Sequence, residues 1–222
     1  DRMRIKAAGK WGKGMKRRSL LKAGAAFAVR GVLSFGASAK PVSKAKAPKV
    51  VVVDFSRPGM NYVSGDMVNL PGGNTEKFAK IIAKTLDAPL FRIEPVTPYP
   101  FDYRKTTAIA REERSAGKAR DAKAIPDIRG YDVIFWGHPI WYGEMPYIVR
   151  GVLSKLDCAG KTIVPFVTHE GSGIGDTANL VRSFQKRAAV REGLGILGTR
   201  FARNEPVEPE ITAWLKRLGY QK

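Results

Sequence analysis

The chain has 222 residues, a formal net charge of +19, one cysteine and two histidines. This length suits one α/β domain with additional segments. A single cysteine excludes an internal disulfide and a cysteine-rich metal site, and two histidines cannot form a multi-histidine site, so no metal is expected.

The positive charge is concentrated near the start of the chain. Residues 1–49 hold 14 of the 39 Lys and Arg residues and one of the 20 acidic residues, a net charge of +13, which leaves +6 for the rest. Proteins that bind nucleic acids carry a basic patch on the folded surface. Since the remainder of this chain is only mildly basic, we expect no nucleic-acid partner, although its charge is compatible with an anionic ligand.

Residues 1–39 have the pattern of an export signal. Residues 16–22 (KRRSLLK) resemble the twin-arginine motif, the next stretch is apolar and rich in Ala and Gly, and residues 37–39 (ASA) match a small-residue cleavage site. A disordered basic tail and a membrane anchor are the alternatives, but Arg30 within the apolar stretch disfavours a stable span. We therefore expect export by the twin-arginine machinery to a periplasmic or secreted location, and a mature form that does not span a membrane.

A folded domain is predicted over residues 49–222, after a Lys-, Ala- and Pro-rich linker over residues 40–48. Its first strand is predicted over residues 49–55, because a run of β-branched residues indicates a buried strand. A helix is predicted over residues 76–86, where apolar residues recur at helical spacing.

A polar, glycine-containing loop joins this strand to this helix. It begins as Ser56, Arg57, Pro58 and Gly59, and resumes as Gly73, Asn74 and Thr75 after an insertion at residues 60–73. A helix N-terminus offers unpaired N–H groups and a positive dipole end, and hydroxyl groups add donors, so such a loop can hold a phosphate. An ordinary strand-to-helix turn is the alternative. The insertion is polar and rich in turn residues, which predicts a loop or a small hairpin.

The rest of the domain alternates strands with helices. Strands are predicted over residues 89–95, 132–137, 161–167 and 190–197, and helices over residues 103–118, 147–156, 176–187 and 206–218. This alternation favours a three-layer, doubly wound α/β fold with a five-stranded parallel sheet. Ligands of such sheets bind beyond the carboxyl ends of the strands, and the unusual loops follow three strands, at residues 56–75, 138–143 and 168–173.

Several stretches resemble the flavodoxin family. Without the insertion, the first loop reads Ser-Arg-Pro-Gly-Asn-Thr, similar to the flavodoxin loop that binds the 5′-phosphate of FMN. Residues 131–143 (YDVIFWGHPIWYG) resemble the strand and aromatic loop beside the isoalloxazine ring, and residues 160–173 resemble the next strand with its Gly-Ser loop. The resemblance covers about residues 49–197 and implies the strand order 2-1-3-4-5. The chain differs in its split loop, in Pro58 where flavodoxins often have Thr, and in its basic domain.

The resemblance implies that FMN is the cofactor and gives each loop a role. The first loop would bind the phosphate through Ser56, Asn74 and Thr75, with Gly59 in the same loop and Arg57 either adding charge or facing solvent. The second would border the flavin ring through Pro139, Ile140, Trp141, Tyr142 and Gly143. The third would line the pyrimidine side through Thr168, His169, Gly171, Ser172 and Gly173. His169 is a candidate proton donor, although a hydrogen-bonding role within the loop is preferred, and Tyr62 of the insertion is a candidate neighbour of the flavin.

The expected function is that of an exported FMN-binding electron-transfer protein whose partner is a redox protein or a quinone. FMN carries the electron chemistry, and the protein supplies binding and tuning. No arrangement of Ser, His and Asp, of paired carboxylates or of Cys and His stands out, so no catalytic residue is predicted. The alternatives are an FMN quinone reductase linked to NAD(P)H or quinol, and a flavodoxin-fold binding module without FMN. The chain shows no clear second nucleotide-binding motif, which favours the shuttle over the reductase.

Overall fold

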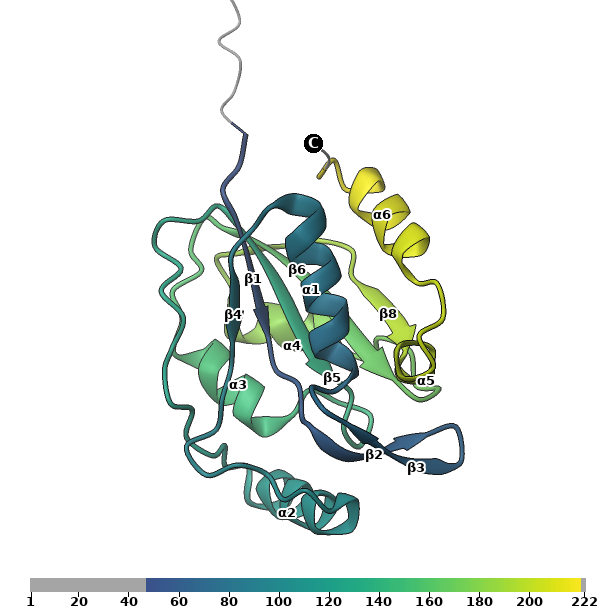
Figure 1. The fold of residues 1–222 in the computed structure, drawn as a ribbon. Helices are drawn as coiled ribbons and strands as arrows, with labels where there is room; N and C mark the ends of the chain where they lie inside the picture. Colours follow the sequence, from purple (N-terminus) through teal and green to yellow (C-terminus); the bar gives the residue numbers. More distant parts are fainter. Residues whose placement is uncertain (1–46, 221–222) are drawn as a thin grey trace, which may run out of the picture. The chain divides into compact units, whose positions relative to one another are not determined.

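The computed structural model describes residues 47–220, so the predicted export signal and nearly all of the predicted linker lie outside the described residues. Within them, a central parallel sheet has helices on both faces (Figure 1). No helix in residues 47–220 has the length and apolar character needed to cross a membrane. The predicted three-layer α/β class is confirmed.

The sheet has the strand order β4-β1-β5-β6-β7, and β8 also pairs with β6. Its strands are all parallel, and they span β1 Val50–Asp54, β4 Leu90–Arg92, β5 Val133–Pro139, β6 Thr162–His169, β7 Ala189–Val190 and β8 Leu194–Leu197. The predicted order 2-1-3-4-5 is confirmed, with β7 and β8 together in the place of the fifth strand.

The fifth strand is split because its neighbour β6 contains a proline. β7 pairs with Thr162 and Ile163, whereas β8 pairs with the stretch from Phe166 to His169. Pro165 lies between these two stretches and has no N–H group to donate to the ladder. The single strand predicted over residues 190–197 is therefore two short strands.

The two faces of the sheet carry separate hydrophobic cores. Side chains alternate between the faces along a strand, so Val51 and Val53 of β1 pack on one face and Val52 on the other. The first core is closed by α3 (Tyr147–Ser154) and α4 (Thr177–Phe184). The second is closed by α1 (Asn74–Leu86), α5 (Gly198–Ala202) and α6 (Glu208–Arg217). Burying a large apolar side chain stabilises a fold by roughly 1.5–3 kcal/mol, so these two cores stabilise the sheet that carries the strand ends.

Two elements lie beyond the carboxyl ends of the strands instead of on a sheet face. They are the antiparallel hairpin of β2 (Gly59–Val63) and β3 (Asp66–Leu70), and α2 (Tyr103–Ala116) (Figure 1). The hairpin is the insertion predicted at residues 60–73. Asp102 caps α2 by accepting a hydrogen bond from the Lys105 backbone N–H at 2.8 Å. Both elements therefore flank the edge of the sheet at which ligands of this architecture bind.

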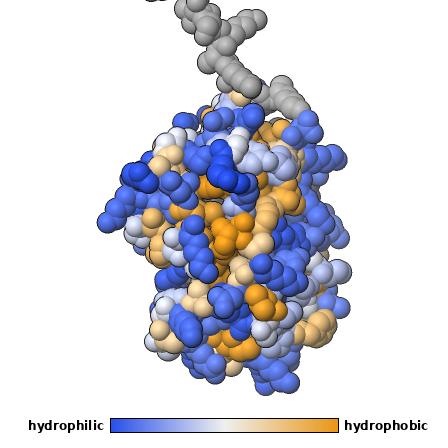
Figure 2. Space-filling model, turned by 90° about the vertical axis from the view of Figure 1, so that its left-hand side faces the viewer, coloured by the Kyte–Doolittle hydropathy of each residue, from blue (hydrophilic) through white to orange (hydrophobic). Residues whose placement is uncertain are grey.

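One side of the sheet ends in a very short strand. Figure 2 views the side of the domain on which β4 lies, where a strip of hydrophobic surface is enclosed by hydrophilic side chains. β4 has only three residues, so it presents few unpaired backbone groups to another sheet edge. The strand predicted over residues 89–95 spans only Leu90–Arg92 in the structure.

Candidate functional site

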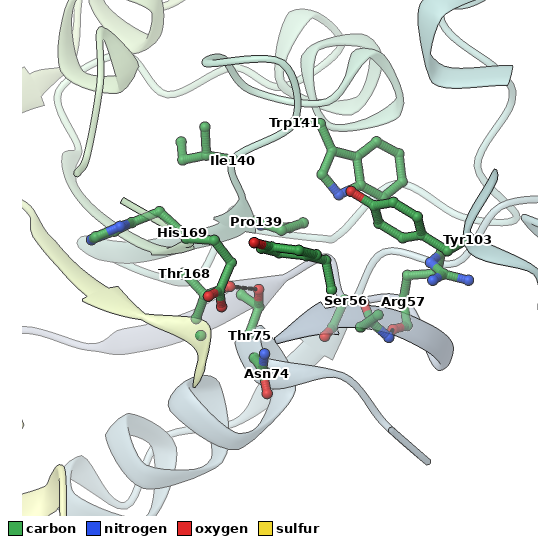
Figure 3. Close-up of a pocket in the computed structure, with 14 residues that line it drawn as sticks. Ser56, Arg57, Asn74, Thr75, Tyr103, Pro139, Ile140, Trp141, Thr168 and His169 are labelled. Atoms are coloured by element: carbon green, nitrogen blue, oxygen red, sulfur yellow. Dashed lines mark hydrogen bonds between the residues drawn. The ribbon is translucent and has the colours of Figure 1, made fainter. Parts of the chain in front are cut away.

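The carboxyl ends of β1, β5 and β6 meet at a cavity of about 160 Å³, which we name the strand-end cavity (Figure 3). Segments far apart in the sequence contribute to it: the two halves of the split loop, the hairpin, the start of α2, and the segments after β5 and β6. Its lining consists of Ser56, Arg57, Asn61, Tyr62, Asn74, Thr75, Tyr103, Pro139, Ile140, Trp141, Thr168, His169, Glu170 and Gly198. The predicted convergence of three loops is therefore present in the structure.

The two halves of the split loop are adjacent in space. Gly73, the residue before α1, has a φ of 76°, and a Cβ atom there would lie 2.4 Å from Ser56 Oγ and 2.7 Å from the Arg57 carbonyl oxygen. Only glycine avoids this overlap and adopts this φ readily. The chain on either side of the hairpin therefore lies close together in space. The two halves form one strand-to-helix loop although the hairpin separates them in the sequence.

The start of α1 has the features of an anion site. No side chain caps this helix, so its first N–H groups remain available as donors. Asn74 Oδ1 is buried and has no hydrogen-bond partner within the described residues. The hydroxyl groups of Thr75 and Thr168 lie 2.7 Å apart and link α1 to the end of β6. The N–H groups of the helix, the threonine hydroxyl groups and the close backbone approach at Gly73 form a cradle that fits a phosphate, whereas the Asn74 oxygen can only accept a hydrogen bond.

Arg57 is buried, so the solvent-facing alternative of the sequence analysis is wrong. Only 6% of the residue is exposed, and its guanidinium donates hydrogen bonds to the backbone carbonyls of Pro100 at 2.8 Å and Phe101 at 3.3 Å, and to that of Met60. Burial lowers the pKa of its guanidinium, and the nearby side chains of Tyr103 and Asp102 act in the opposite direction. The cation therefore joins the hairpin to the segment before α2 while it lines the cavity.

Gly59 is buried against this same segment. A Cβ atom at Gly59 would lie 2.8 Å from the Phe101 carbonyl oxygen, and its φ is 101°. The glycine thus permits the hairpin to start close to the backbone at Phe101. Gly59 does not line the strand-end cavity, and its role in cofactor binding stays a prediction.

Pro139, Ile140 and Trp141 line the cavity from the end of β5. Pro139 was predicted in a loop, but β5 continues to this residue because its ladder with β6 extends to the pair Pro139 and Thr168. The Trp141 ring packs edge-on against Phe55, with centroids 5.5 Å apart, and against Tyr99, with centroids 5.0 Å apart. These contacts fix the indole in one orientation.

Tyr142 and Gly143 form a tight turn beside the cavity. Both have positive φ values, 50° and 79°, and the backbones of Trp141 and Glu144 exchange hydrogen bonds at 2.9 and 3.0 Å. Positive φ at both central residues defines a type I′ turn. The Tyr142 hydroxyl donates to the Thr107 carbonyl of α2 at 2.9 Å. Neither residue lines the strand-end cavity, and their contact with a flavin stays a prediction.

The end of β6 places Thr168 and His169 at the cavity, and Glu170 follows directly after the strand. Thr168 and His169 belong to β6 and not to the predicted loop. His169 Nδ1 accepts a hydrogen bond from the Gly171 N–H at 3.0 Å, and burial lowers the pKa of the imidazole. This geometry matches the hydrogen-bonding role that the sequence analysis preferred. Gly171, Ser172 and Gly173 lie beyond the cavity lining, so their flavin contacts also stay predictions.

Four cavity residues were not among the predicted site residues: Asn61, Tyr103, Glu170 and Gly198. Glu170 lies in the sequence between the predicted site residues His169 and Gly171. This position alone could have indicated that it lines the cavity. Tyr103 directly follows the cap of α2, but no local pattern shows that α2 reaches the strand ends. Gly198 belongs to α5, a short helix that was not predicted.

Comparison with known proteins identifies the fold family. The family model described as flavodoxin matches residues 49–218. The chain belongs to the flavodoxin family. A crystal structure from Bacteroides eggerthii DSM 20697, assigned as a flavoprotein, is 26% identical with a TM-score of 0.62, and the match covers 78% of this chain and 98% of that one. No curated protein matches this chain significantly.

Two more distant flavoproteins share this flavodoxin fold. One from Bacteroides uniformis ATCC 8492 is 23% identical with a TM-score of 0.60, over 77% of this chain and 99% of that one. One from Lactobacillus acidophilus NCFM, solved in complex with FMN, is 20% identical with a TM-score of 0.51, over 67% of this chain and 93% of that one. Membership of the flavodoxin family makes FMN the cofactor of this domain, and the cradle at Gly73, Asn74 and Thr75 fits its phosphate group.

Proposed function

We propose that the domain binds FMN in the strand-end cavity and passes electrons between redox partners. Bound FMN supplies one- and two-electron chemistry, while the protein binds and orients it. The observation that carries this proposal is the rejoined loop: Ser56 and Gly73 are in contact, and together they lead into the uncapped start of α1. The phosphate is held there by Ser56, Asn74 and Thr75, and the flavin ring is bordered by Pro139, Ile140 and Trp141.

The visible absorption spectrum of the purified full-length chain tests this proposal. We expect a flavin spectrum that survives desalting after FMN is added. Ser56→Ala and Thr75→Val should each weaken FMN binding by tenfold or more, since a hydrogen bond to a charged group contributes roughly 1.5–3 kcal/mol. Riboflavin lacks the phosphate, so its binding should change little. Ser154→Ala, on the exposed side of α3, is the matched control. A chain that holds no FMN would overturn the proposal.

Electron transfer without a nicotinamide substrate is part of this proposal. The FMN-loaded chain should be reduced by dithionite and reoxidised by an electron acceptor, and it should show no steady-state oxidation of NADH or NADPH. Robust turnover of either nicotinamide in the presence of a quinone would favour the reductase alternative and would overturn the shuttle.

We also propose that residues 1–39 direct export by the twin-arginine route. This route carries folded proteins, so FMN could be bound in the cytoplasm before the protein crosses the membrane. Replacing Arg17 and Arg18 together by Lys should keep the flavin-containing protein in the cytoplasmic fraction, whereas Arg30→Lys should leave its distribution unchanged. Unchanged export of the double variant would contradict the proposal.

A further inference from the structure

All of the net positive charge of the described residues lies at the end of the sheet opposite the strand-end cavity. We name this end the amino edge, because the strands begin there, and it comprises residues 47–49, 84–89, 127–132, 155–161, 182–188 and 216–220. These segments hold ten Lys and Arg residues and four Asp residues, a net charge of +6. Residues 47–220 hold 25 Lys and Arg and 19 acidic residues in all, so the remainder has 15 residues of each sign and no net charge.

The cations of the amino edge are available to a partner, whereas its acids are engaged. Six exposed cations have no side-chain hydrogen bond or ion pair within residues 47–220: Lys49, Lys84, Lys155, Lys186, Lys216 and Arg217. None of the four acids is free. Asp127 and Asp157 each pair with an arginine of the same edge. Asp132 accepts a hydrogen bond from the Lys49 backbone N–H at 2.8 Å.

Helix ends account for part of this charge but not for all of it. α1, α3, α4 and α6 all end at the amino edge, and Lys84, Lys216 and Arg217 lie in last turns, where cations oppose the helix dipole. The C-terminus of a helix carries the equivalent of about half a negative charge, so four helix ends offset roughly two positive charges. A positive surplus therefore remains at this edge.

The amino edge is too far from the strand-end cavity to serve the phosphate of FMN. β5 crosses from one end of the sheet to the other with seven residues, and a strand rises about 3.3 Å per residue, which gives roughly 20 Å. Exposed charges are largely screened beyond about 8 Å at physiological ionic strength. Figure 1 shows the C-terminal end of α6 at the top, far from the hairpin and α2 at the bottom. The charge therefore suits a different anionic partner.

The composition of the amino edge favours a membrane surface with anionic lipids. Five of its six unpaired cations are lysines, which act as hydrated point charges, whereas arginine is the residue of choice for nucleic-acid phosphates. Clusters of four to eight basic residues attract anionic lipid headgroups by charge alone. Residues 40–46, which precede this edge in the sequence, add Lys40, Lys44 and Lys46 and no acid. The basic character thus continues into the predicted linker.

We propose that the amino edge docks the domain on a membrane surface that carries anionic lipids, with Lys155, Lys186 and Lys216 facing the headgroups. In this orientation the strand-end cavity faces away from the membrane and stays open to a soluble partner. This docking surface goes beyond the proposed function, because it involves neither FMN nor the cavity.

The test is co-sedimentation of the full-length chain with phosphatidylcholine vesicles that contain or lack phosphatidylglycerol. We expect tighter binding to the anionic vesicles, and this binding should weaken as salt is added, because salt screens exposed charges. Lys155→Gln, Lys186→Gln and Lys216→Gln together should weaken it by about a hundredfold, since each cation next to an anionic surface contributes about fivefold. Residues 1–46 are the same in every variant, so their own affinity for vesicles cancels in the comparison.

A matched control removes the same charge from another part of the surface. Arg104, Lys105 and Lys118 lie in α2 or directly after it, and all three are exposed. Arg104→Gln, Lys105→Gln and Lys118→Gln together should change vesicle affinity by less than about twofold, because these charges lie beyond the screening length from the membrane.

Acetylation of the vesicle-bound, full-length chain gives a second measurement. Docking should protect Lys155, Lys186 and Lys216 from the reagent, while Lys105 and Lys118 remain as reactive as in the free chain. Equal reactivity of the two groups would show that residues 1–46 alone hold the chain on the vesicle, and it would overturn the docking surface.

The remaining outcomes also decide the proposal. Equal affinity for vesicles with and without phosphatidylglycerol, or equal losses in the two triple variants, overturns the docking surface. Tighter binding to a mixed-sequence DNA duplex than to the anionic vesicles would assign the amino edge to nucleic acid and would also overturn it. The amino-edge variant should hold as much FMN as the wild type. A wild-type chain that holds no FMN overturns the proposed function, and the vesicle titration then still decides the docking surface.

Discussion

Gly73 touches Ser56 although the whole β2–β3 hairpin separates them in the chain: a Cβ atom at Gly73 would lie 2.4 Å from Ser56 Oγ. The hairpin is therefore inserted into the strand-to-helix loop without separating the two ends of that loop in space. This explains how a family loop that normally runs without interruption accepts an insertion, because the backbone on each side of the hairpin keeps the positions needed at the start of α1.

Gly73→Ala should damage the loop and the FMN site together. The substitution forces a side chain into a φ of 76° and into overlap with Ser56 Oγ and the Arg57 carbonyl, and strain of this kind costs about 1–3 kcal/mol. We expect lower stability in urea unfolding and at least a tenfold loss of FMN affinity. Gly130→Ala, where a Cβ atom would meet nothing within 4 Å, is the control. A Gly73→Ala protein with wild-type stability would contradict the close packing.

Arg57 should stabilise the fold through its geometry as well as its charge. Arg57→Met leaves the Met60 carbonyl without its side-chain donor, whereas the Pro100 and Phe101 carbonyls keep the Thr106 hydroxyl and the Met60 N–H. One unsatisfied buried polar group costs about 1–3 kcal/mol. Arg57→Lys keeps the charge, but the ammonium lacks the planar fork that reaches several carbonyls. We expect both variants to lose roughly 1–3 kcal/mol of unfolding free energy in urea, with Met losing more because it donates no hydrogen bond.

A matched control for Arg57 is Arg129→Met. Arg129 pairs with Asp127 at the surface, with 89% of its side chain exposed, and such pairs contribute about 0–1 kcal/mol. If Arg57→Lys unfolds at the same urea concentration as the wild type, the carbonyl contacts of the guanidinium are unimportant for stability.

The sequence was informative where local patterns decide the structure. β-branched runs predicted the strands, and glycine-containing loops after them predicted the split loop, Pro139 to Trp141, and Thr168 with His169 at one cavity. These residues share the carboxyl edge of a parallel sheet, so their convergence follows from topology alone.

Residues placed by tertiary packing escaped prediction. α5 begins with a glycine and has only five residues; it is held by Phe201, whose ring stacks on Phe78 with centroids 5.3 Å apart. Burial of Arg57 depends on the carbonyls of Pro100 and Phe101, which no local pattern connects to it. Asn61 and Tyr103 reach the cavity only because the hairpin and α2 fold toward the strand ends.

Glu170 should oppose phosphate binding at the start of α1. A Cβ atom at Gly198 would lie 2.7 Å from both Glu170 Oε1 and Asn74 Nδ2, so the carboxylate is close to the first residue of the helix. Two like charges a few ångströms apart repel by about 1 kcal/mol even in water. Glu170→Gln keeps the size of the side chain and an oxygen that can accept from the Thr199 hydroxyl. We therefore expect FMN to bind about fivefold more tightly to this variant.

Riboflavin and salt distinguish this charge effect from a change in shape. Riboflavin has no phosphate, so its affinity should be equal in the wild type and in Glu170→Gln. The gain for FMN should shrink at high ionic strength, because salt screens exposed charges. Glu208→Gln, at the start of α6, is the control. An FMN affinity that falls in Glu170→Gln would show that the carboxylate supports the site.

Asp54 should make the domain less stable as the pH rises toward neutrality. It is the last residue of β1 and fully buried; Arg92 Nη2 lies 3.4 Å from its Oδ2, and its Oδ1 has no hydrogen-bond partner within the described residues. Burial raises its pKa from 3.8 to about 6, against the attraction of Arg92. The folded state binds this proton more tightly than the unfolded state does. The protonated Asp54 therefore contributes most to the free energy of unfolding below about pH 4, and this contribution is lost as the pH rises through about 6.

Asp54→Asn removes this titration and keeps the shape of the side chain. The variant should gain stability relative to the wild type between pH 4 and pH 7, by up to roughly 3 kcal/mol, since each pKa unit corresponds to about 1.4 kcal/mol. Urea unfolding of both proteins at several pH values measures the difference in their free energies of unfolding. Both proteins carry the same neighbouring charges at Glu76, Arg92 and Lys80, so the effects of these charges cancel in the difference to first order. Asp127→Asn, at the surface, should not reproduce the gain. A difference that stays constant with pH would show that Asp54 titrates normally and that Arg92 compensates fully for its burial.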